Sequence, residues 1–458
     1  MKIGIPSSVS LDDSPASASI PEHVEKMTNV RVNPSSTSLT HEELDEARRS
    51  KRARIVKDFE SDFVTYNIED DPITFRDAMS SSEAKQWKEA VKSEMDSIVS
   101  YGTWVLVDLP LGCTTIGCKW VFKKKLKLDG TVNKFKAKLV AKDFQQKEGI
   151  DYFDTYSPVA RLTTIRVLIA LASVYSLPIH QIDVKITFLH GELDEKIYMD
   201  QPEGFVAHGN ECKVCKLVKS LYGFKQAPKQ WHEKFDKTIL AFGFTLNEND
   251  KYIYCKVKGD KKFILCLYVD DILLIGSCVE IITETNSLLK NKFEMKDMGG
   301  ADVILVIKLI RSTDGIAIFQ SHYVEKIIEK FGYQNSIIAK TSYDSSVALF
   351  KNESGISVAQ LRYSQIIGSL QYLANGTRPD ISFSVSKLAR YTSCPDKTHW
   401  GALDRVLRYL KGMVSLSILY GRFPAVLEEY SDVSWISKNS GCNGCSGYVF
   451  TLGGEAVS

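Results

Sequence analysis

The sequence predicts an α+β fold, because patterns typical of antiparallel hairpins and of amphipathic helices both recur along the chain. The strongest hairpin pattern is the run 262–276, in which Asp270 and Asp271 interrupt an otherwise apolar stretch and mark a tight turn at Val269-Asp270. A second hairpin pattern is the lysine-rich, partly alternating stretch 119–147. Apolar residues at helical spacing occur before, between and after these two hairpins.

Length and composition indicate a globular protein. With 458 residues the chain can hold two to three domains, and 44% hydrophobic and 25% charged residues are ordinary values. The net charge is only +2, so a nucleic-acid partner would need a local basic patch. We expect no membrane span, since the run 167–174 is far too short, and no secretory signal in residues 1–20.

The first 70 residues are rich in Ser, Pro, Asp and Glu, which predicts a disordered leader within residues 1–80. Inside it lies a basic cluster, Arg48–Arg54. The cluster is interpreted as a nuclear localisation signal, a nucleic-acid-binding arm or plain linker.

A helix is predicted from Ser82, which would be its N-cap, to Gly102, followed by a strand over 103–106. The lysine-rich stretch then predicts a hairpin turning at Asp129-Gly130, with ten lysines between 119 and 147 against two acids. A charged strand face usually only contacts solvent, but this cationic face would also be suited to binding phosphates. The apolar face of the helix is formed by Trp87, Val91, Met95 and Ile98.

Asp183 ends a short apolar strand that follows a predicted buried helix over 163–175. Two adjacent carboxylates on a hairpin resist joint ionisation, and a divalent cation would remove that cost. A solvated turn is the plain alternative, since Asp is common in turns. Asp183 together with Asp270 and Asp271 would form a cage for two Mg²⁺ ions, the arrangement used for phosphoryl displacement.

Further helices are predicted after these strands. The first has Trp231, Phe235 and Ile239 facing inward and Gly243 at its end. The predicted segments are 230–242, 322–331, 362–374, 380–391 and 400–410.

The ten cysteines do not form a disulfide framework in a chain this long, so reduced thiols and an intracellular location are expected. Two Cys-x-x-Cys pairs, Cys212/Cys215 and Cys442/Cys445, leave a shared zinc site open as an alternative.

Several motifs, in order, resemble the reverse transcriptase of copia-type LTR retrotransposon polyproteins. The signature Tyr268-Val269-Asp270-Asp271 resembles the polymerase motif of reverse transcriptases, and the resemblance runs from about Trp87 to the C-terminus. The other matching segments are 119–123, 136–142, 157–161, 221–228 and 363–373.

The resemblance implies a right-hand polymerase fold. Fingers and palm would occupy residues 81–345, a helical thumb or connection 346–425, and a truncated ribonuclease H-like start 426–458. Partners would be an RNA template, a DNA primer and dNTP, with no membrane, in a cytoplasmic particle or the nucleus.

The resemblance also assigns residues. Asp183, Asp270 and Asp271 would be catalytic and, with the Val184 carbonyl, would hold two Mg²⁺ ions for attack of a primer 3′-hydroxyl on a dNTP.

Four further positions would bind the nucleotide. Lys136 and Lys138 would reach the triphosphate, Phe188 would exclude a ribose 2′-hydroxyl, and Tyr222 would form the pocket floor, followed by Gly223. Phe188 alone is equally an ordinary core residue.

Some positions depart from the family pattern. Lys138 stands where Arg is usual, which keeps the charge without the planar fork. Two alternatives therefore remain open: a catalytically weak or dead remnant that at most binds nucleic acid, and an unrelated metal-dependent phosphotransferase. The other departures are Asp143 and Val306 for Gly, Thr187 for Ala, and Ser342 for Pro.

Overall fold

The computed structural model describes residues 71–126, 132–277, 279–434 and 445–458. Every described residue belongs to one compact unit, Asn67–Ser458. Residues 1–70 of the predicted disordered leader with its Arg48–Arg54 cluster, the Asp129-Gly130 turn and Cys442 lie outside the described residues. The last ten residues of the predicted leader, 71–80, are described, and the prediction of disorder is wrong there, because Phe75–Ser80 form a helix that buries Ala78. The zinc alternative, which needs Cys442, therefore stays a hypothesis.

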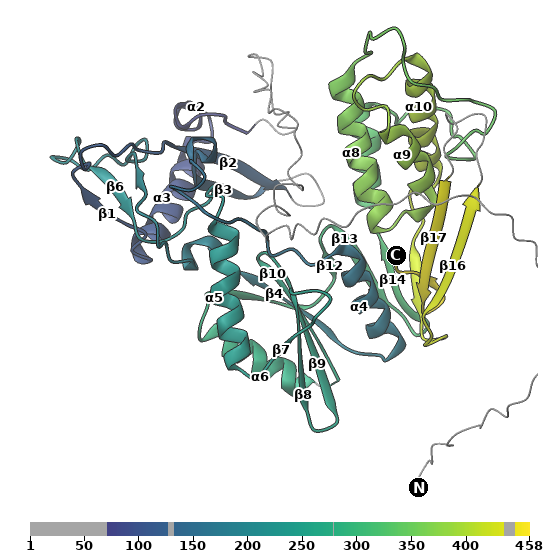
Figure 1. Ribbon diagram of the computed structural model, residues 1–458, viewed down its shortest axis with the longest axis horizontal. Helices are drawn as coiled ribbons and strands as arrows, with labels where there is room; N and C mark the ends of the chain where they lie inside the picture. The colour runs from purple at the N-terminus through teal and green to yellow at the C-terminus, as the bar shows by residue number, and fades with distance from the viewer. Residues whose placement is uncertain (1–70, 127–131, 278, 435–444) are drawn as a thin grey trace, which may run out of the picture. The chain divides into compact units, whose positions relative to one another are not determined.

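A six-stranded antiparallel sheet carries the Asp-Asp hairpin (Figure 1). Tyr268 and Asp271 face each other across the hairpin, so the predicted two-residue turn at Val269-Asp270 is confirmed. The sheet order is β11 (Met295–Gly300), β4 (Ile179–Val184), β10 (Asp271–Gly276), β9 (Lys261–Tyr268), β8 (Ile253–Lys258) and β7 (Thr245–Leu246).

Helices pack on both faces of this sheet, which explains why the hairpin strands are apolar at nearly every position. Leu273 and Ile275 share a buried cluster with residues of α4 (Leu162–Val174). Ile272 and Leu274 belong to a second cluster with residues of α5 (Ala227–Ala241) and α6 (Val279–Lys290).

The helix predicted over 230–242 is α5, and its start differs from the prediction. It begins at Ala227 because Pro228 lies in its first turn, where the missing N–H of proline costs nothing.

Segments from both sides of β4 in the chain form a separate buried cluster around Trp87 and Leu139. The lysine-rich strands pair as predicted. Ser82 is not an N-cap, because it lies in the short turn between two helices and Glu83 precedes the first residue of the second. The elements are α2 (Phe75–Ser80), α3 (Ala84–Ser100), β1 (Trp104–Val107), β2 (Cys118–Leu126), β3 (Val132–Ala141), β5 (Tyr198–Met199) and β6 (Val214–Leu217).

A four-stranded sheet, β12 (Val303–Ile304), β13 (Ile307–Arg311), β14 (Gly315–Phe319) and β15 (Ile418–Gly421), follows the six-stranded one. All predicted later helices are present, with a 3-10 turn, Pro379–Ile381, preceding α9. Their bounds are α7 (Ser321–Phe331), α8 (Gln360–Gly376), α9 (Ser382–Ala389) and α10 (Lys397–Gly412). The last strands are β16 (Glu428–Ser434), β17 (Cys445–Leu452) and β18 (Glu455–Ala456), and β16 pairs with β17.

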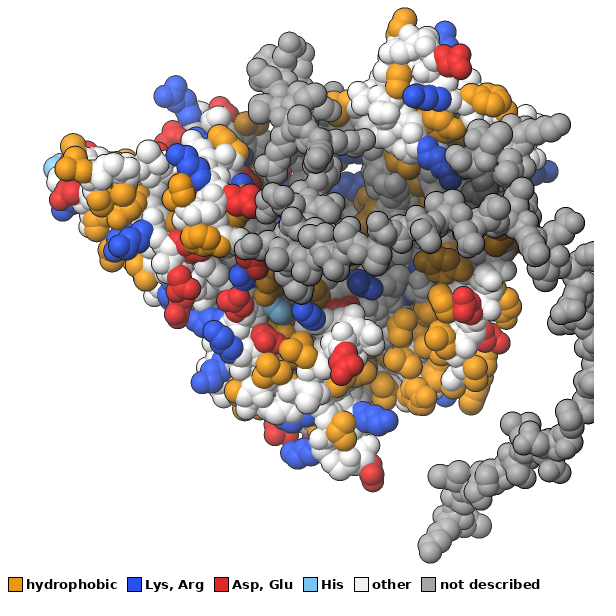
Figure 2. Space-filling view, in the orientation of Figure 1, with side chains coloured by type: hydrophobic (Ala, Val, Ile, Leu, Met, Phe, Trp, Pro, Cys, Tyr) orange, Lys and Arg blue, Asp and Glu red, His pale blue; other side chains and the backbone are white. Residues whose placement is uncertain are grey.

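The surface carries charges of both signs. On the face drawn in Figure 2, Lys and Arg side chains are interspersed with Asp and Glu, in agreement with the low net charge. Among the described residues, no helix combines the length and the apolar character that crossing a membrane requires.

Val306, where the family pattern has glycine, adopts a left-handed backbone with φ +66° and is exposed. A β-branched residue is strained there by about 1–2 kcal/mol. We predict that Val306→Gly raises the free energy of unfolding by about 1 kcal/mol, since relief of strain exceeds the added entropy of the unfolded chain. Val303→Gly, at an exposed valine of β12, is the matched control and should lower stability. Urea unfolding measures both, and a destabilised Val306→Gly variant would contradict the strain argument.

Candidate active site

The tip of the β9–β10 hairpin has a strained backbone. Val269 has φ +57°, at the first loop position, where two-residue hairpin turns favour glycine. Such a conformation costs about 1–3 kcal/mol and persists only where the surroundings fix it. The Val269 N–H donates to the Pro158 carbonyl at 2.8 Å, and the Trp231 indole N–H donates to the Val269 carbonyl at 2.8 Å. The tip is therefore held by two segments from outside the hairpin.

Pairing of β4 with β10 brings the three predicted carboxylates together. Asp183 lies opposite Asp271, and the Val184 N–H donates to the Asp270 carbonyl at 2.8 Å. The expectation that Asp183 meets the hairpin turn is thus confirmed. The catalytic roles of these residues stay a prediction.

The three carboxylates differ in their surroundings. Asp183 and Asp270 line a cavity of about 530 Å³. Asp271 is not among the residues that line this cavity, and its Oδ1 accepts a hydrogen bond from Gln181 Nε2 at 3.1 Å. Because Asp271 pairs directly with Asp183, the two side chains lie on the same face of the sheet. No local sequence pattern predicts the hydrogen bond between Asp271 and Gln181.

Burial and mutual repulsion act on these carboxylates. Burial raises the pKa of Asp183 above its usual value, and the nearby Asp270 carboxylate raises it further. Burial likewise raises the pKa of Asp271, against the hydrogen bond from Gln181, which lowers it. The site therefore disfavours negative charge, and a bound cation would offset this cost.

The oxygen atoms present fit a hard divalent cation. Within the described parts of the chain, no three His, Cys, Asp or Glu residues are grouped closely enough to hold a metal unaided. Mg²⁺, however, is usually bound by one or two carboxylates, with substrate phosphates and water completing its shell. Asp183, Asp270 and the Val184 carbonyl can supply the ligands that come from the protein. The Val184 carbonyl already accepts a hydrogen bond from Thr187 Oγ1 at 3.1 Å.

All four predicted nucleotide-binding residues line the same cavity. The Lys138 ammonium lies 3.7 Å from the centre of the Tyr222 ring, and that ring meets Phe188 edge-on with centroids 5.2 Å apart. Lys136 projects from the same strand, β3, two residues earlier. Cationic and aromatic side chains thus face the two carboxylates across one space.

Lys136 and Lys138 of β3 both have a lowered pKa. Burial, with repulsion from Lys125 and Lys138, lowers the pKa of Lys136 to about 8. Burial also lowers the pKa of Lys138, against attraction from Glu94 and Asp270. A bound polyanion would favour the charged form of both.

The backbone of Tyr222 and Gly223 lies in close contact with β3. The Ala141 N–H donates to the Tyr222 carbonyl at 2.8 Å. Gly223 has φ +94°, and a Cβ there would lie 2.3 Å from the Ala141 carbonyl oxygen. Glycine is therefore required, as the expected close approach of the backbone implies.

Glu94 of α3 is a cavity residue that the sequence analysis missed. Burial raises the pKa of its carboxyl group, and Oε1 has no hydrogen-bond partner in the described part of the chain. The helical spacing could have indicated its burial, since Glu94 lies seven residues after Trp87 and so falls on the buried stripe of the helix.

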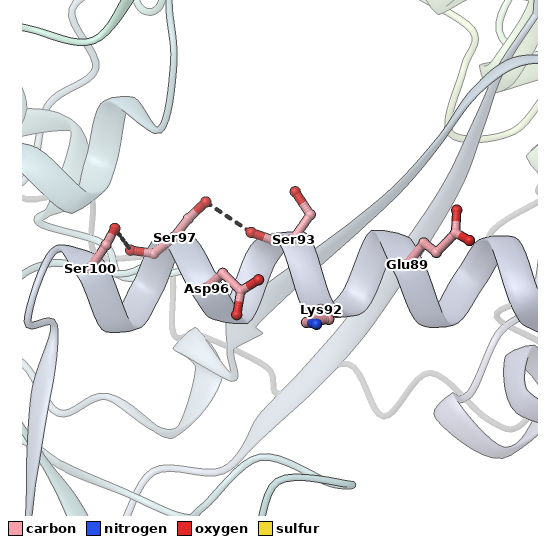
Figure 3. A pocket seen from close by; sticks show the side chains of 6 residues that line it. All are labelled: Glu89, Lys92, Ser93, Asp96, Ser97 and Ser100. Atoms are coloured by element: carbon pink, nitrogen blue, oxygen red, sulfur yellow. Dashed lines mark hydrogen bonds between the residues drawn. The ribbon is translucent and has the colours of Figure 1, made fainter.

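A second hollow, of about 460 Å³, lies on α3 beside this cavity (Figure 3). Two of its serine hydroxyls bond to the helix backbone: Ser97 Oγ donates to the Ser93 carbonyl at 2.9 Å, and Ser100 Oγ donates to the Ser97 carbonyl at 2.8 Å. None of the predicted site residues lines it, so the larger cavity is the candidate site.

Comparison with known proteins decides the family. The family described as reverse transcriptase (RNA-dependent DNA polymerase) matches residues 101–343, about half of the chain. The chain belongs to the reverse transcriptase family. The "Putative transposon Ty5-1 protein" of Saccharomyces cerevisiae, 32% identical over 278 residues, supports this, because the match covers 60% of this chain and 90% of that protein.

The reverse transcriptase relatives include Pol polyproteins of copia-type transposons. The "Retrovirus-related Pol polyprotein from transposon TNT 1-94" of Nicotiana tabacum is 37% identical over 422 residues, 90% of this chain and 32% of the relative. The corresponding polyprotein from transposon RE2 of Arabidopsis thaliana is 34% identical over 385 residues, 84% of this chain and 26% of the relative. The chain thus spans a third or less of these polyproteins.

The lowered pKa of Lys136 predicts pH-dependent nucleotide binding. As pH rises through about 8, Lys136 loses its charge and the affinity for dNTP should fall by roughly tenfold, the worth of one charge-assisted contact. Equilibrium dNTP binding to a complex with a chain-terminated primer measures this without chemistry. Lys136→Arg, which stays charged, should show a clearly weaker dependence. Equal pH profiles for both proteins would contradict this role of Lys136.

Proposed function

We propose that this chain is an RNA-directed DNA polymerase, transferring nucleotides from dNTP to a primer 3′-hydroxyl on an RNA template. The observation that supports this best is the single cavity that brings Asp183 and Asp270 together with Lys136, Lys138 and Tyr222. These residues come from four distant parts of the chain. Because the chain belongs to the reverse transcriptase family, their meeting in one cavity supports a role in nucleotide transfer.

Each group has a distinct task in the proposed reaction. Lys136 and Lys138 bind the triphosphate, and the Tyr222 ring holds the Lys138 ammonium in place. Phe188, in contact with Tyr222, restricts space beside the sugar and selects a deoxyribose by shape. Orientation by these contacts contributes to the rate by aligning the reacting atoms.

Asp183, Asp270 and the Val184 carbonyl would hold the divalent cations, proposed as two Mg²⁺ ions, and Asp271 completes the acidic triad. Bound there, the cations would lower the pKa of the primer hydroxyl and would neutralise negative charge on the triphosphate. The raised pKa of Asp183 supports this, because a carboxylate disfavoured when alone gains most from a cation.

The layout that we propose is that of a right-hand polymerase. Fingers and palm would comprise residues 81–345, the helical thumb or connection 346–425, and a ribonuclease H-like start 426–458. The pairing of β16 with β17 supports the last assignment. An RNA template and a DNA primer would be the partners, in a cytoplasmic particle or the nucleus.

A second candidate function is nucleic-acid binding by a remnant with weak or no catalysis. Two observations favour it. The Thr187 hydroxyl donates to the Val184 carbonyl, a proposed metal ligand, and Val306 is strained where the family pattern has glycine. A primer-extension assay distinguishes the two candidate functions, since a remnant would retain primer–template binding without extension.

Primer extension on poly(rA)/oligo(dT) with Mg²⁺ and dTTP tests the proposal. We expect extension by the unchanged chain and a loss of about 10²–10³-fold or more in Asp270→Asn, which removes charge where it is needed in the transition state. Asp260→Asn is the matched control, because Asp260 is exposed in the turn between β8 and β9, at the far end of β9. No extension by the unchanged chain, or equal rates in both variants, would overturn the polymerase assignment.

A further inference from the structure

The proposed catalytic turn is fixed by groups that lie outside the catalytic motif. Val269 is the residue immediately before Asp270, and both of its backbone polar groups are used by other segments. Pro158 accepts from its N–H and Trp231 donates to its carbonyl. Because a β-branched residue at φ +57° tends to relax to an extended backbone, removal of either contact would let the turn move.

Trp231 is held in one orientation. Its side chain is fully buried and meets Phe235, Phe293 and His190 with ring centroids 5.5, 5.2 and 5.7 Å away. A ring enclosed by other rings has little rotational freedom, so its N–H remains directed at the Val269 carbonyl.

The next residue of α5 secures the other side of the turn. His232 Nδ1 lies 2.9 Å from the hydroxyl of Tyr156, and His232 Nε2 lies 3.2 Å from that of Tyr254. Tyr156 is two residues before Pro158, whose carbonyl receives the Val269 N–H. Of these two consecutive residues of α5, Trp231 therefore contacts the Val269 carbonyl directly, and His232 contacts the segment whose Pro158 carbonyl accepts the Val269 N–H.

We propose that Trp231 is a positioning residue, which places Asp270 through the carbonyl of Val269 so that Asp270 and Asp183 can share a divalent cation. This inference rests on the proposed function. An ordinary core tryptophan would stabilise the fold without affecting cation binding, and that difference makes the proposal testable.

Trp231→Phe keeps an aromatic ring and removes the donor. Groups that orient a metal ligand typically change metal affinity or activity by about 10-fold to 100-fold when they are lost. We expect a fall of that size in kcat for primer extension and a weaker affinity for Mn²⁺, measured by the electron paramagnetic resonance signal of the free ion. The KM for dTTP should change little, because the lysines and Tyr222 are untouched.

Trp87→Phe is the matched control. Trp87 is also fully buried in a helix, and its indole N–H has no partner among the described residues. This variant should lose stability in urea unfolding while kcat and Mn²⁺ affinity remain unchanged.

Two further variants keep the test decisive. If Trp231→Phe does not fold, site-specific replacement of Trp231 by benzothienylalanine, of nearly the same shape but without the N–H, should show the same losses. Val269→Gly introduced together with Trp231→Phe should recover much of the lost kcat, because glycine adopts a left-handed φ without being held there.

The outcomes distinguish the positioning role of Trp231 from the proposed polymerase activity. If the unchanged chain extends no primer, the polymerase proposal fails, and Mn²⁺ affinity alone then decides the role of Trp231. If the unchanged chain is active and either donor-free variant keeps its kcat and Mn²⁺ affinity, the positioning role is overturned while the polymerase proposal stands.

Discussion

The antiparallel pairing of β4 with β10 is the interaction on which the candidate site depends. It places Asp183 beside a hairpin turn that is 87 residues later in the chain, and the Val184 N–H fixes the Asp270 carbonyl at the point of contact. Two clusters of apolar side chains, one on each face of the sheet, hold the strands in this register. A slip of one residue would reverse every side chain and separate the carboxylates.

Several groups near this pairing are in energetically unfavourable states that a bound ligand would relieve. Asp183 and Asp271 have raised pKa values, Lys136 and Lys138 have lowered ones, and Val269 is strained. Each is costly in the free protein, and opposite charges brought by a cation and a triphosphate would offset the electrostatic part. Perturbed groups gathered around one cavity are typical of functional sites.

Local patterns allowed much of the architecture to be predicted. Period-two alternation in the lysine-rich strands and the apolar stripe at Trp87, Val91 and Met95 depend on neighbours in sequence, and both elements are present. Contacts between distant segments were not predictable in this way. No sequence pattern shows that Asp271 turns toward Gln181, or that the Trp231 indole reaches the Val269 carbonyl, because both depend on how separate elements pack.

We propose that Asp183 and Asp270 hold a divalent cation between them. Anomalous X-ray scattering from crystals grown with Mn²⁺, a primer–template and dTTP tests it most directly. We expect an anomalous peak at coordination distance, about 2.1 Å, from a carboxylate oxygen of each residue and from the Val184 carbonyl. A peak bound elsewhere, or ordered primer and nucleotide with no peak at these two carboxylates, would contradict it.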